Sequence, residues 1–181
     1  MKRAVIFSGG AFEKPDWVTL PKDAVILCAD SGLRHAKALG ISPDWVLGDF
    51  DSSSEQPEGE SVLRYPPEKD DTDTQSTLNL AIRRGAKNIL ILGATGGRLD
   101  HFIGNMGLLG YGRQKGVNVI LADAQNYICL VENGHIIRKD SQFGKYVSFF
   151  AAGETVEGLT LKGFKYPLDH YRLTTDNCGR T

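Results

Sequence analysis

Short apolar runs recur along the first two thirds of the chain, and several are followed by a segment with helical spacing. The runs are AVIF (4–7), AVILCA (24–29), WVLG (45–48), VLRY (62–65), NILILGA (88–94) and VNVILA (117–122). Runs this short and this continuously apolar are typical of strands buried on both faces. The pattern therefore predicts an α/β domain over residues 1–122, with a mainly parallel sheet flanked by helices.

Three helices are predicted between these runs. The segment SGLRHAKALG has Ser31 as a candidate N-cap and ends at Gly40. The segment TDTQSTLNLAIRRGA begins with Thr72 and Gln75 in capping-box spacing and ends at Gly85. The third helix follows GGR and carries an apolar stripe at helical spacing, formed by Leu99, Phe102, Ile103, Met106 and Leu109. We expect this stripe to pack on the sheet.

The pattern changes after residue 122. The segment NYICLVENGHIIRK indicates two strands around Asn133-Gly134, a strong signal for a hairpin. The segments KYVSFFAAG, ETVEGLTLKGF and YRLTTDN add β-rich pieces separated by glycine-containing turns. Residues 123–181 are therefore expected to form a small antiparallel, β-sandwich-like domain.

Charge and composition narrow the choice of partners. The chain has 21 Lys and Arg against 22 Asp and Glu, so no overall field attracts nucleic acid or an anionic membrane. No apolar run approaches the roughly 18 residues of a membrane span, and the first run is too short for a signal peptide. The three cysteines have no C-x-x-C spacing, which is typical of reduced thiols in a cytoplasmic protein.

Acidic residues follow the predicted strands. In a parallel α/β sheet, ligands bind outside the carboxyl ends of the strands, so these positions are the ones to inspect. They hold Asp30, Asp49, Asp51, the group Asp70, Asp71 and Asp73, and Asp100. Carboxylates crowded at one edge repel one another, and a hard cation such as Mg²⁺ relieves that repulsion. The clusters therefore predict a metal site.

Each acidic cluster also has a simpler interpretation. Asp30 or Asp73 at a helix start can serve only as a cap. GDFDS can be a turn that tolerates acids, and KDDTD can be a solvated charge run. Because three such clusters each lie just past a predicted strand, a shared metal site is favoured over three unrelated caps, turns or charge runs.

The segment GATGGRLDHFIGN (93–105) carries the second candidate chemistry. Glycines near a helix start let backbone amides approach an anion, and Arg98 offers a planar fork for phosphate. Arg98, His101 and Asn105 lie at i, i+3 and i+7, which places them along one edge of the helix as a nucleotide-facing row. The alternatives are a simple glycine turn at Gly96-Gly97, a surface arginine and a hydrogen-bonded histidine. The fingerprints G-x-x-x-x-G-K-[ST] and G-x-G-x-x-G are missing.

Four ordered motifs carry a family resemblance: ADSG (29–32), GDFDS (48–52), K-D-x-T-D (69–73) and GGRLDH (96–101). In this order and at these separations, they resemble the thiamine pyrophosphokinase family. The resemblance implies transfer of a pyrophosphoryl group from ATP to the hydroxyl of thiamine, giving thiamine diphosphate and AMP, with Mg²⁺ as cofactor. It also implies a homodimer in which thiamine lies between the α/β domain of one subunit and the β domain of the other.

The resemblance assigns roles residue by residue. It implies metal binding by Asp49, Asp51, Asp70 and Asp73, whereas Asp71 falls on the variable position of its motif. It implies that Gly96, Gly97 and Arg98 hold ATP, with Asp30 completing that edge. Asp73 or Asp100 is expected to accept the proton of the attacking hydroxyl. No residue of the thiamine pocket is assigned.

The end of the chain departs from the family pattern. Family members continue past the position of NCGRT with a Ser-Asn segment and further strands, whereas this chain ends at Thr181. The β domain is therefore expected to be shorter than that of the family. Two other functions stay open at this point: a pyrophosphokinase of the same fold acting on a hydroxymethylpterin, and a non-catalytic sensor of nucleotide or thiamine diphosphate.

Overall fold

The computed structural model describes residues 2–13, 19–50, 57–59, 61–64 and 71–176. The chain divides into two compact units, Met1–Leu130 and Val131–Thr181, which we call the α/β unit and the β unit. The sequence pattern had placed the boundary after residue 122. The compact α/β unit extends to Leu130, because strand β7 (Tyr127–Cys129) pairs with β6 (Asn118–Ala122).

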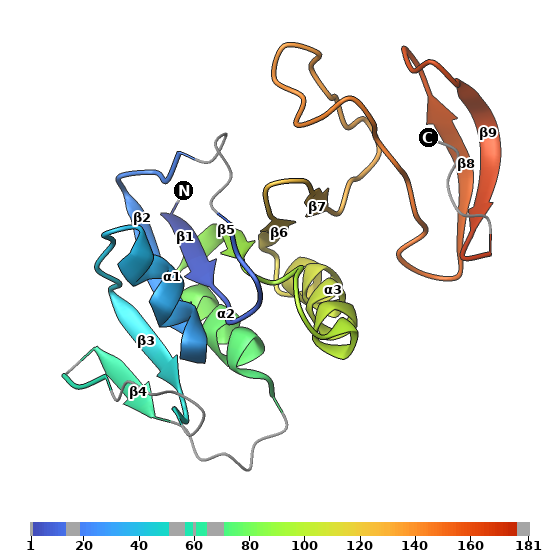
Figure 1. Ribbon diagram of the computed structural model, residues 1–181. Helices are drawn as coiled ribbons and strands as arrows, with labels where there is room; N and C mark the ends of the chain where they lie inside the picture. Colours follow the sequence, from blue (N-terminus) through green and yellow to red (C-terminus); the bar gives the residue numbers. More distant parts are fainter. Residues whose placement is uncertain (1, 14–18, 51–56, 60, 65–70, 177–181) are drawn as a thin grey trace. The chain divides into compact units, whose positions relative to one another are not determined.

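A seven-stranded sheet forms the centre of the α/β unit, in the order β4-β3-β2-β1-β5-β6-β7 (Figure 1). Its other strands are β1 (Lys2–Phe7), β2 (Ala24–Ala29), β3 (Trp45–Gly48), β4 (Val62–Arg64) and β5 (Ala86–Leu92). Strands β1 to β6 pair in parallel, and β7 is antiparallel. The prediction of a mainly parallel sheet from the apolar runs is confirmed.

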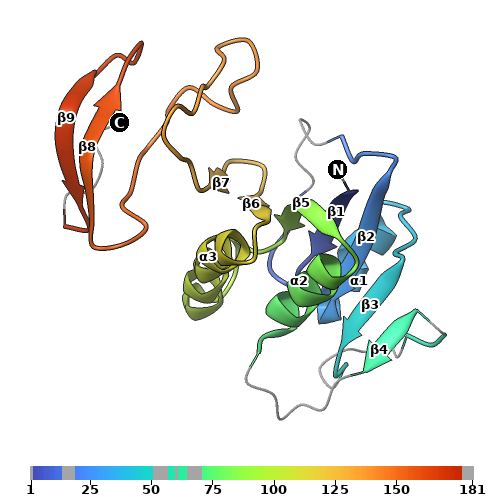
Figure 2. The ribbon, with the colours of Figure 1, turned by 180° about the vertical axis from the view of Figure 1, so that it is seen from behind.

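Helices cover both faces of this sheet, as Figures 1 and 2 show from opposite sides. Alternate residues of a strand point to opposite faces, so β1 contributes to two cores. Ile6 lies in a cluster with Leu78 of α2 (Asp73–Arg83). Phe7 lies in a second cluster with Leu33 of α1 (Leu33–Ala38). The sheet is therefore buried on both faces, which explains why its strands are apolar throughout.

The starts of the first two helices differ in their capping. The backbone turns through a short 3₁₀ segment, Asp30–Gly32, before α1, so Gly32 and not Ser31 occupies the N-cap position. At α2, the Thr72 hydroxyl accepts a hydrogen bond from the Gln75 amide over 3.2 Å, as the capping-box pattern predicted. The Gln75 side chain donates to Asp71 instead of completing the reciprocal bond of the box.

The third helix, α3 (Leu99–Gln114), packs on the sheet with only part of the predicted stripe: Leu109 is buried, and Met106 packs against the core cluster. Leu99 and Ile103 of the predicted stripe are 75% and 69% exposed. The buried residues of α3 are Asn105, Leu108, Leu109 and Gly112. A side chain at Gly112 would collide with Val119 of β6, so this glycine marks where the helix lies closest to the sheet. Because α3 is apolar on more than one face, spacing alone could not identify the buried one.

The β unit contains an antiparallel pair of strands, β8 (Thr155–Leu161) and β9 (Leu168–Thr174). The expected hairpin around Asn133-Gly134 is wrong. These two residues do form a turn, in which the His135 amide donates to the Glu132 carbonyl, but the described residues on either side are not paired strands. The preceding strand, β7, finds its partner in β6, because the open edge of the large sheet is available to it.

Among the described residues, we find no helix that combines the length and the apolar character needed to cross a membrane.

Candidate functional site

The order of the strands defines one place on the sheet for a ligand. Strands β2, β3 and β4 lie on one side of β1, whereas β5 and β6 lie on the other. In an open parallel sheet, the crevice at such a switch point, outside the carboxyl ends of the strands, is where ligands bind. The loops after β1 and β5 flank this point. The site is therefore expected between residues 8–10 and 93–98.

These two loops interlock through their glycines. The Gly10 amide donates to the Gly93 carbonyl over 2.9 Å, and the Ser8 amide donates to Leu92 over 2.8 Å. A Cβ atom at Gly10 would lie 2.5 Å from the Gly93 oxygen and 2.6 Å from the Gly96 oxygen, so only glycine allows this approach. Our reading of the sequence missed Ser8–Gly10. The signal was available, because this segment directly follows an apolar run.

The neighbouring ends of β2 and β3 place Asp30 against Gly48, the residue before Asp49. Residue Ala29 of β2 is level with Leu47 of β3, so Asp30 follows at the level of Gly48. A Cβ atom at Gly48 would lie 3.0 Å from Asp30 Cα and 3.1 Å from its Oδ1. Glycine at position 48 therefore lets the Asp30 side chain lie against the end of β3.

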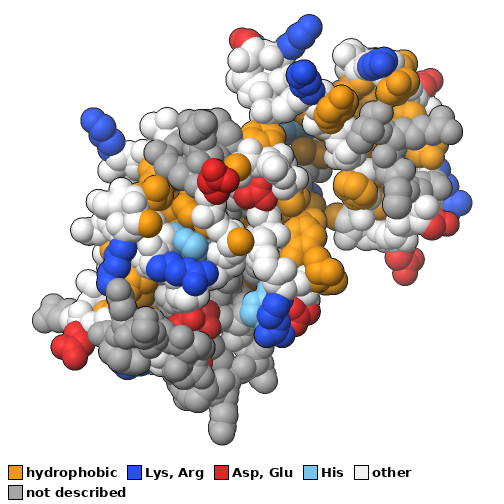
Figure 3. Space-filling model, in the orientation of Figure 1, with side chains coloured by type: hydrophobic (Ala, Val, Ile, Leu, Met, Phe, Trp, Pro, Cys, Tyr) orange, Lys and Arg blue, Asp and Glu red, His pale blue; other side chains and the backbone are white. Residues whose placement is uncertain are grey.

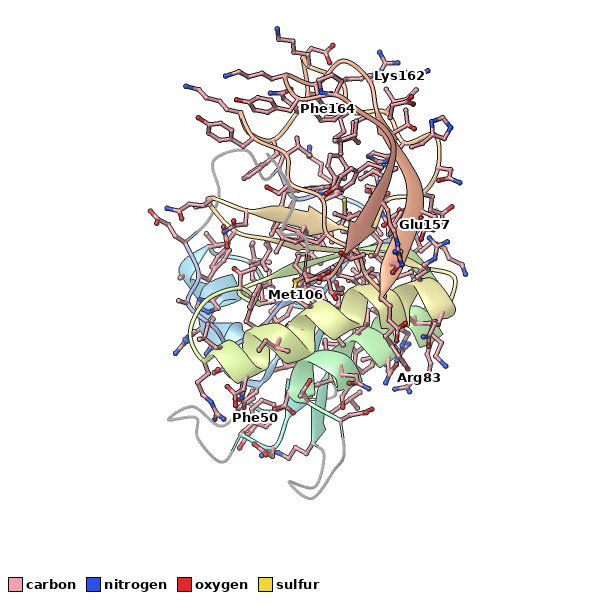
Figure 4. The ribbon with its side chains drawn as sticks, turned by 90° about the vertical axis from the view of Figure 1, so that its right-hand side faces the viewer. Phe50, Arg83, Met106, Glu157, Lys162 and Phe164 are labelled. Atoms are coloured by element: carbon pink, nitrogen blue, oxygen red, sulfur yellow. The ribbon has the colours of Figure 1, made fainter. Side chains whose placement is uncertain are left out.

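Phe50 anchors the turn that carries Asp49. Its side chain is 1% exposed and lies in the same core cluster as Leu33, while the guanidinium of Arg64 lies 5.1 Å from the ring centroid. Phe50 and Asp30 both have left-handed backbones, with φ of 57° and 44°. Such conformations are costly for non-glycine residues and cluster at functional sites. Figure 4 labels Phe50 at the end of α2 opposite to Arg83, the last residue of that helix.

The start of α2 is tied to the loop after β1. The hydroxyls of Ser8 and Thr74 share a buried hydrogen bond of 2.7 Å. Asp73, the first residue of α2, is therefore held at the same edge as Ser8–Gly10. Asp71 accepts hydrogen bonds from the side chains of Gln75 and Asn79, at 2.7 and 3.3 Å, which gives it a role in supporting the helix.

Arg98 and Asp100 form an ion pair at the start of α3. The guanidinium Nε and Nη2 donate to Oδ1 and Oδ2 of Asp100 over 3.1 and 2.5 Å, and the His101 amide donates to Oδ1 over 3.0 Å. The hydrogen bond from Arg98 is the main reason that the pKa of Asp100 is lowered, and the same bond raises the pKa of Arg98. Figure 3 shows a histidine beside a basic and an acidic side chain on the surface of the α/β unit.

Asn105 lies apart from the other two members of the predicted nucleotide-facing row. Arg98 and His101 are exposed, whereas Asn105 is 8% exposed and its Nδ2 donates to the Ala94 carbonyl over 2.9 Å. The side-chain amide of Asn105 thus holds the backbone of the loop before α3 at Ala94. A role for Asn105 in nucleotide binding is therefore indirect in this arrangement, through the backbone of the loop.

The donor set at this edge suits a hard cation. Over the described residues, no group of three or more His, Cys, Asp or Glu side chains is gathered as a metal cage, and Asp51 and Asp70 lie outside those residues. Mg²⁺ does not need such a cage, because it is usually held by one or two carboxylates together with substrate phosphates and water. Asp30 and Asp49, which follow neighbouring strand ends and offer oxygen donors only, fit that requirement.

A parallel sheet with interlocked glycine loops and acidic side chains at its carboxyl edge defines an open α/β protein, a class that binds its ligands at this edge. The description "Thiamin pyrophosphokinase, catalytic domain" matches residues 18–121, and "Thiamin pyrophosphokinase, vitamin B1 binding domain" matches residues 134–178. The chain belongs to the thiamine pyrophosphokinase family.

Individual relatives agree with this assignment. The thiamine pyrophosphokinase of Bacillus subtilis is 38% identical over 151 residues, which cover 80% of this chain and 71% of the relative. A crystal structure of thiamine pyrophosphokinase from Bacillus subtilis has a TM-score of 0.86 at 34% identity, covering 98% of this chain and 86% of that one. The structure from Geobacillus thermodenitrificans has a TM-score of 0.75 at 30% identity, covering 96% and 83%. These similarities identify an enzyme of this kind.

Proposed function

We propose that the carboxyl edge of the α/β unit binds ATP with Mg²⁺ and aligns it for attack by the hydroxyl of thiamine, giving thiamine diphosphate and AMP. The observation that carries this proposal is the meeting of the two glycine loops with Asp30, Asp49 and Asp73 at one edge of the sheet. The membership of the thiamine pyrophosphokinase family supports the reaction.

The triphosphate is proposed to lie against Gly96, Gly97 and Arg98. Gly97 has a φ of 98°, a conformation that favours glycine and turns the backbone tightly before α3. The amides at the start of this 16-residue helix, with their partial positive charge, suit an anion. A bound phosphate would compete with Asp100 for Arg98, and His101 lies one turn further along the exposed edge.

Asp49 and Asp73 are the described candidate ligands of the proposed metal site, and Asp51 and Asp70 are candidates outside the described residues. In the order of the strands, Asp30 after β2 lies between Asp49 after β3 and the loop after β5. When bound, Mg²⁺ would neutralise phosphate charge, which a hydroxyl nucleophile otherwise has to overcome. The protein's own contribution is alignment of the two substrates, because a primary alcohol attacks only from a well-oriented position.

Asp73 and Asp100 are the two proposed acceptors of the hydroxyl proton. Arg98 keeps the pKa of Asp100 below its usual range, so Asp100 is a weak proton acceptor while this ion pair is intact. Asp73 stands at the start of α2, beside the loop after β1. We therefore favour Asp73, left free of metal, as the base, with Mg²⁺ held by the other carboxylates, and we assign Asp100 the role of orienting Arg98.

Thiamine is proposed to bind with the help of the β unit, in a homodimer located in the cytoplasm, where ATP is available. The match of residues 134–178 to the vitamin B1 binding domain supports the first part. Large apolar side chains of the β unit are exposed in the single chain, including Ile136 at 77%, Tyr146 at 82% and Phe150 at 70%. Exposed apolar surface of this kind is typical of an interface, which supports the dimer.

The direct test is to incubate the protein with ATP, Mg²⁺ and thiamine and to separate the products by chromatography. We expect AMP and thiamine diphosphate in equal amounts, and no turnover when EDTA removes the metal. ADP with thiamine monophosphate would contradict pyrophosphoryl transfer. Turnover with a hydroxymethylpterin and not with thiamine would contradict the proposed substrate. Nucleotide binding without turnover of either compound would indicate a sensor.

A further inference from the structure

Thr95 and Asp123 join the loop after β5 to the turn after β6. The Thr95 hydroxyl donates to Oδ2 of Asp123 over 2.5 Å. Strands β5 and β6 are neighbours, with Leu92 level with Ala122, so both residues follow strand ends at the same edge of the sheet. This is the edge that carries the proposed ATP site, and neither residue has a role in the scheme above.

The Asp123 carboxylate is held in one orientation. Its Oδ1 accepts hydrogen bonds from the backbone amides of Gln125 and Asn126, both over 2.6 Å. Asn126 Nδ2 donates to Oδ1 and Oδ2 over 3.1 and 3.0 Å. Burial alone would raise the pKa of Asp123, but the hydrogen bonds from Thr95, Asn126 and the two amides outweigh it, so the pKa is lowered. With both oxygens engaged, Asp123 is better suited to holding Thr95 than to binding a metal or a proton.

Three successive residues of the loop after β5 are fixed by three different elements. The Gly93 carbonyl accepts from Gly10, after β1, and the Ala94 carbonyl accepts from Asn105, in α3. The Thr95 hydroxyl donates to Asp123, after β6. The segment Gly96–Arg98 begins immediately afterwards. Because glycine has the greatest backbone freedom, the last anchor before it decides where the amides of this segment point.

We propose that Thr95 and Asp123 are a positioning pair for ATP: the hydrogen bond between them orients Gly96–Arg98 for the triphosphate. This inference rests on the proposed function of that segment. The pair acts through the loop, because its own polar groups are turned toward each other and toward the β6–β7 turn.

The test compares Thr95→Val, which removes the hydroxyl but keeps the shape, with Thr95→Ser, which keeps the hydroxyl. Calorimetry with a non-hydrolysable ATP analogue and Mg²⁺, without thiamine, measures nucleotide binding alone. We expect the valine variant to bind the analogue about 10-fold more weakly, as suits the loss of a hydrogen bond to a charged group. The KM for ATP should rise to the same extent while the KM for thiamine stays unchanged. The serine variant should restore both values.

Thr160→Val, the same substitution in the β unit, is the matched control and should bind the analogue as the wild type does. Wild-type affinity in Thr95→Val, or equal losses in Thr95→Val and Thr95→Ser, would overturn the proposal. If Thr95→Val does not fold, Asp123→Ala carries the same test, because it removes the acceptor of the Thr95 hydroxyl. Wild-type affinity in that variant would also overturn the proposal. A wild type that binds the analogue but makes no thiamine diphosphate would refute the proposed function, and the comparison of variants would still decide this inference.

Discussion

Arg98 donates two hydrogen bonds to the carboxylate of Asp100, two residues further along the chain. Both side chains are exposed, at 72% and 61% for the pair, so the interaction is weakened by water and adds little to stability. The ion pair matters because Asp100 neutralises the charge of Arg98 at the start of α3 until a phosphate takes its place. The pair keeps the arginine oriented at the proposed phosphate site, and a phosphate can replace the carboxylate because both accept from the same fork.

Replacing Arg98 should raise the pKa of Asp100. In Arg98→Gln, the charged hydrogen bond that chiefly lowers this pKa is lost, so the carboxyl should titrate closer to its usual range. Carbon-detected NMR of the Asp100 carboxyl over a pH series measures the change. Arg113→Gln, near the other end of α3, is the control and should leave the titration of Asp100 as it is. An unchanged pKa in Arg98→Gln would show that the ion pair does not persist in solution.

Asp49→Asn should remove Mg²⁺-dependent turnover and leave the fold intact. The amide keeps the shape of the side chain but loses the negative charge that a metal requires, so we expect kcat to fall by about 100-fold or more. Steady-state assays over a series of Mg²⁺ concentrations measure this, and circular dichroism monitors the fold. Asp23→Asn is the matched control, since Asp23 is exposed and pairs with Arg3 at the amino end of the sheet. Near-full activity in Asp49→Asn would refute its place in the metal site.

Gly10→Ala should destabilise the protein and lower its activity. The new methyl group would lie 2.5 Å from the Gly93 oxygen, so the two interlocked loops must move apart, at a cost of about 1–3 kcal/mol. Chemical denaturation gives the free energy of unfolding, and the KM for ATP reports on the loops. In contrast, Gly104→Ala in α3 meets no atom within 4 Å and should stabilise the helix by up to about 1 kcal/mol. The prediction fails if both substitutions have the same effect.

Phe50→Ala should lower both stability and metal affinity. The side chain is 1% exposed, and removing a buried ring of this kind costs about 3–5 kcal/mol of the free energy of unfolding. The turn that carries Asp49 would lose its anchor, so a higher Mg²⁺ concentration should be needed for half-maximal activity. Phe50→Leu, which keeps part of the apolar contact, should show a smaller loss in both measurements. Loss of stability without any change in the Mg²⁺ requirement would separate the core role of Phe50 from the metal site.

The site could be foreseen from the sequence where its residues directly follow a strand. Asp30 and Asp49 were found by this rule, and Asp73 by its place at a predicted helix start. The structure holds all three at the carboxyl edge of the sheet. The same rule applied to Ser8–Gly10 and to Asp123, which also follow apolar runs, but no motif distinguished them. Their importance lies in hydrogen bonds to residues more than 25 positions away, such as that between Thr95 and Asp123. Contacts over such separations depend on which strands become neighbours.

In the α/β unit, the sequence by itself determined where the strands and helices form. A strand buried on both faces has to be apolar throughout, so AVILCA and WVLG mark β2 and β3 to the residue. The tertiary structure alone decided the order of the strands, the pairing of β7 with β6 in place of a local hairpin, and the face that α3 turns to the sheet. These features depend on which apolar surfaces are still exposed once the sheet has assembled. Several faces of α3 are apolar enough to pack on the sheet. The face of α3 that packs on the sheet contains Gly112, which allows β6 to come close. In this orientation Asn105 donates to the Ala94 carbonyl in the loop before α3, and Arg98 lies at the surface.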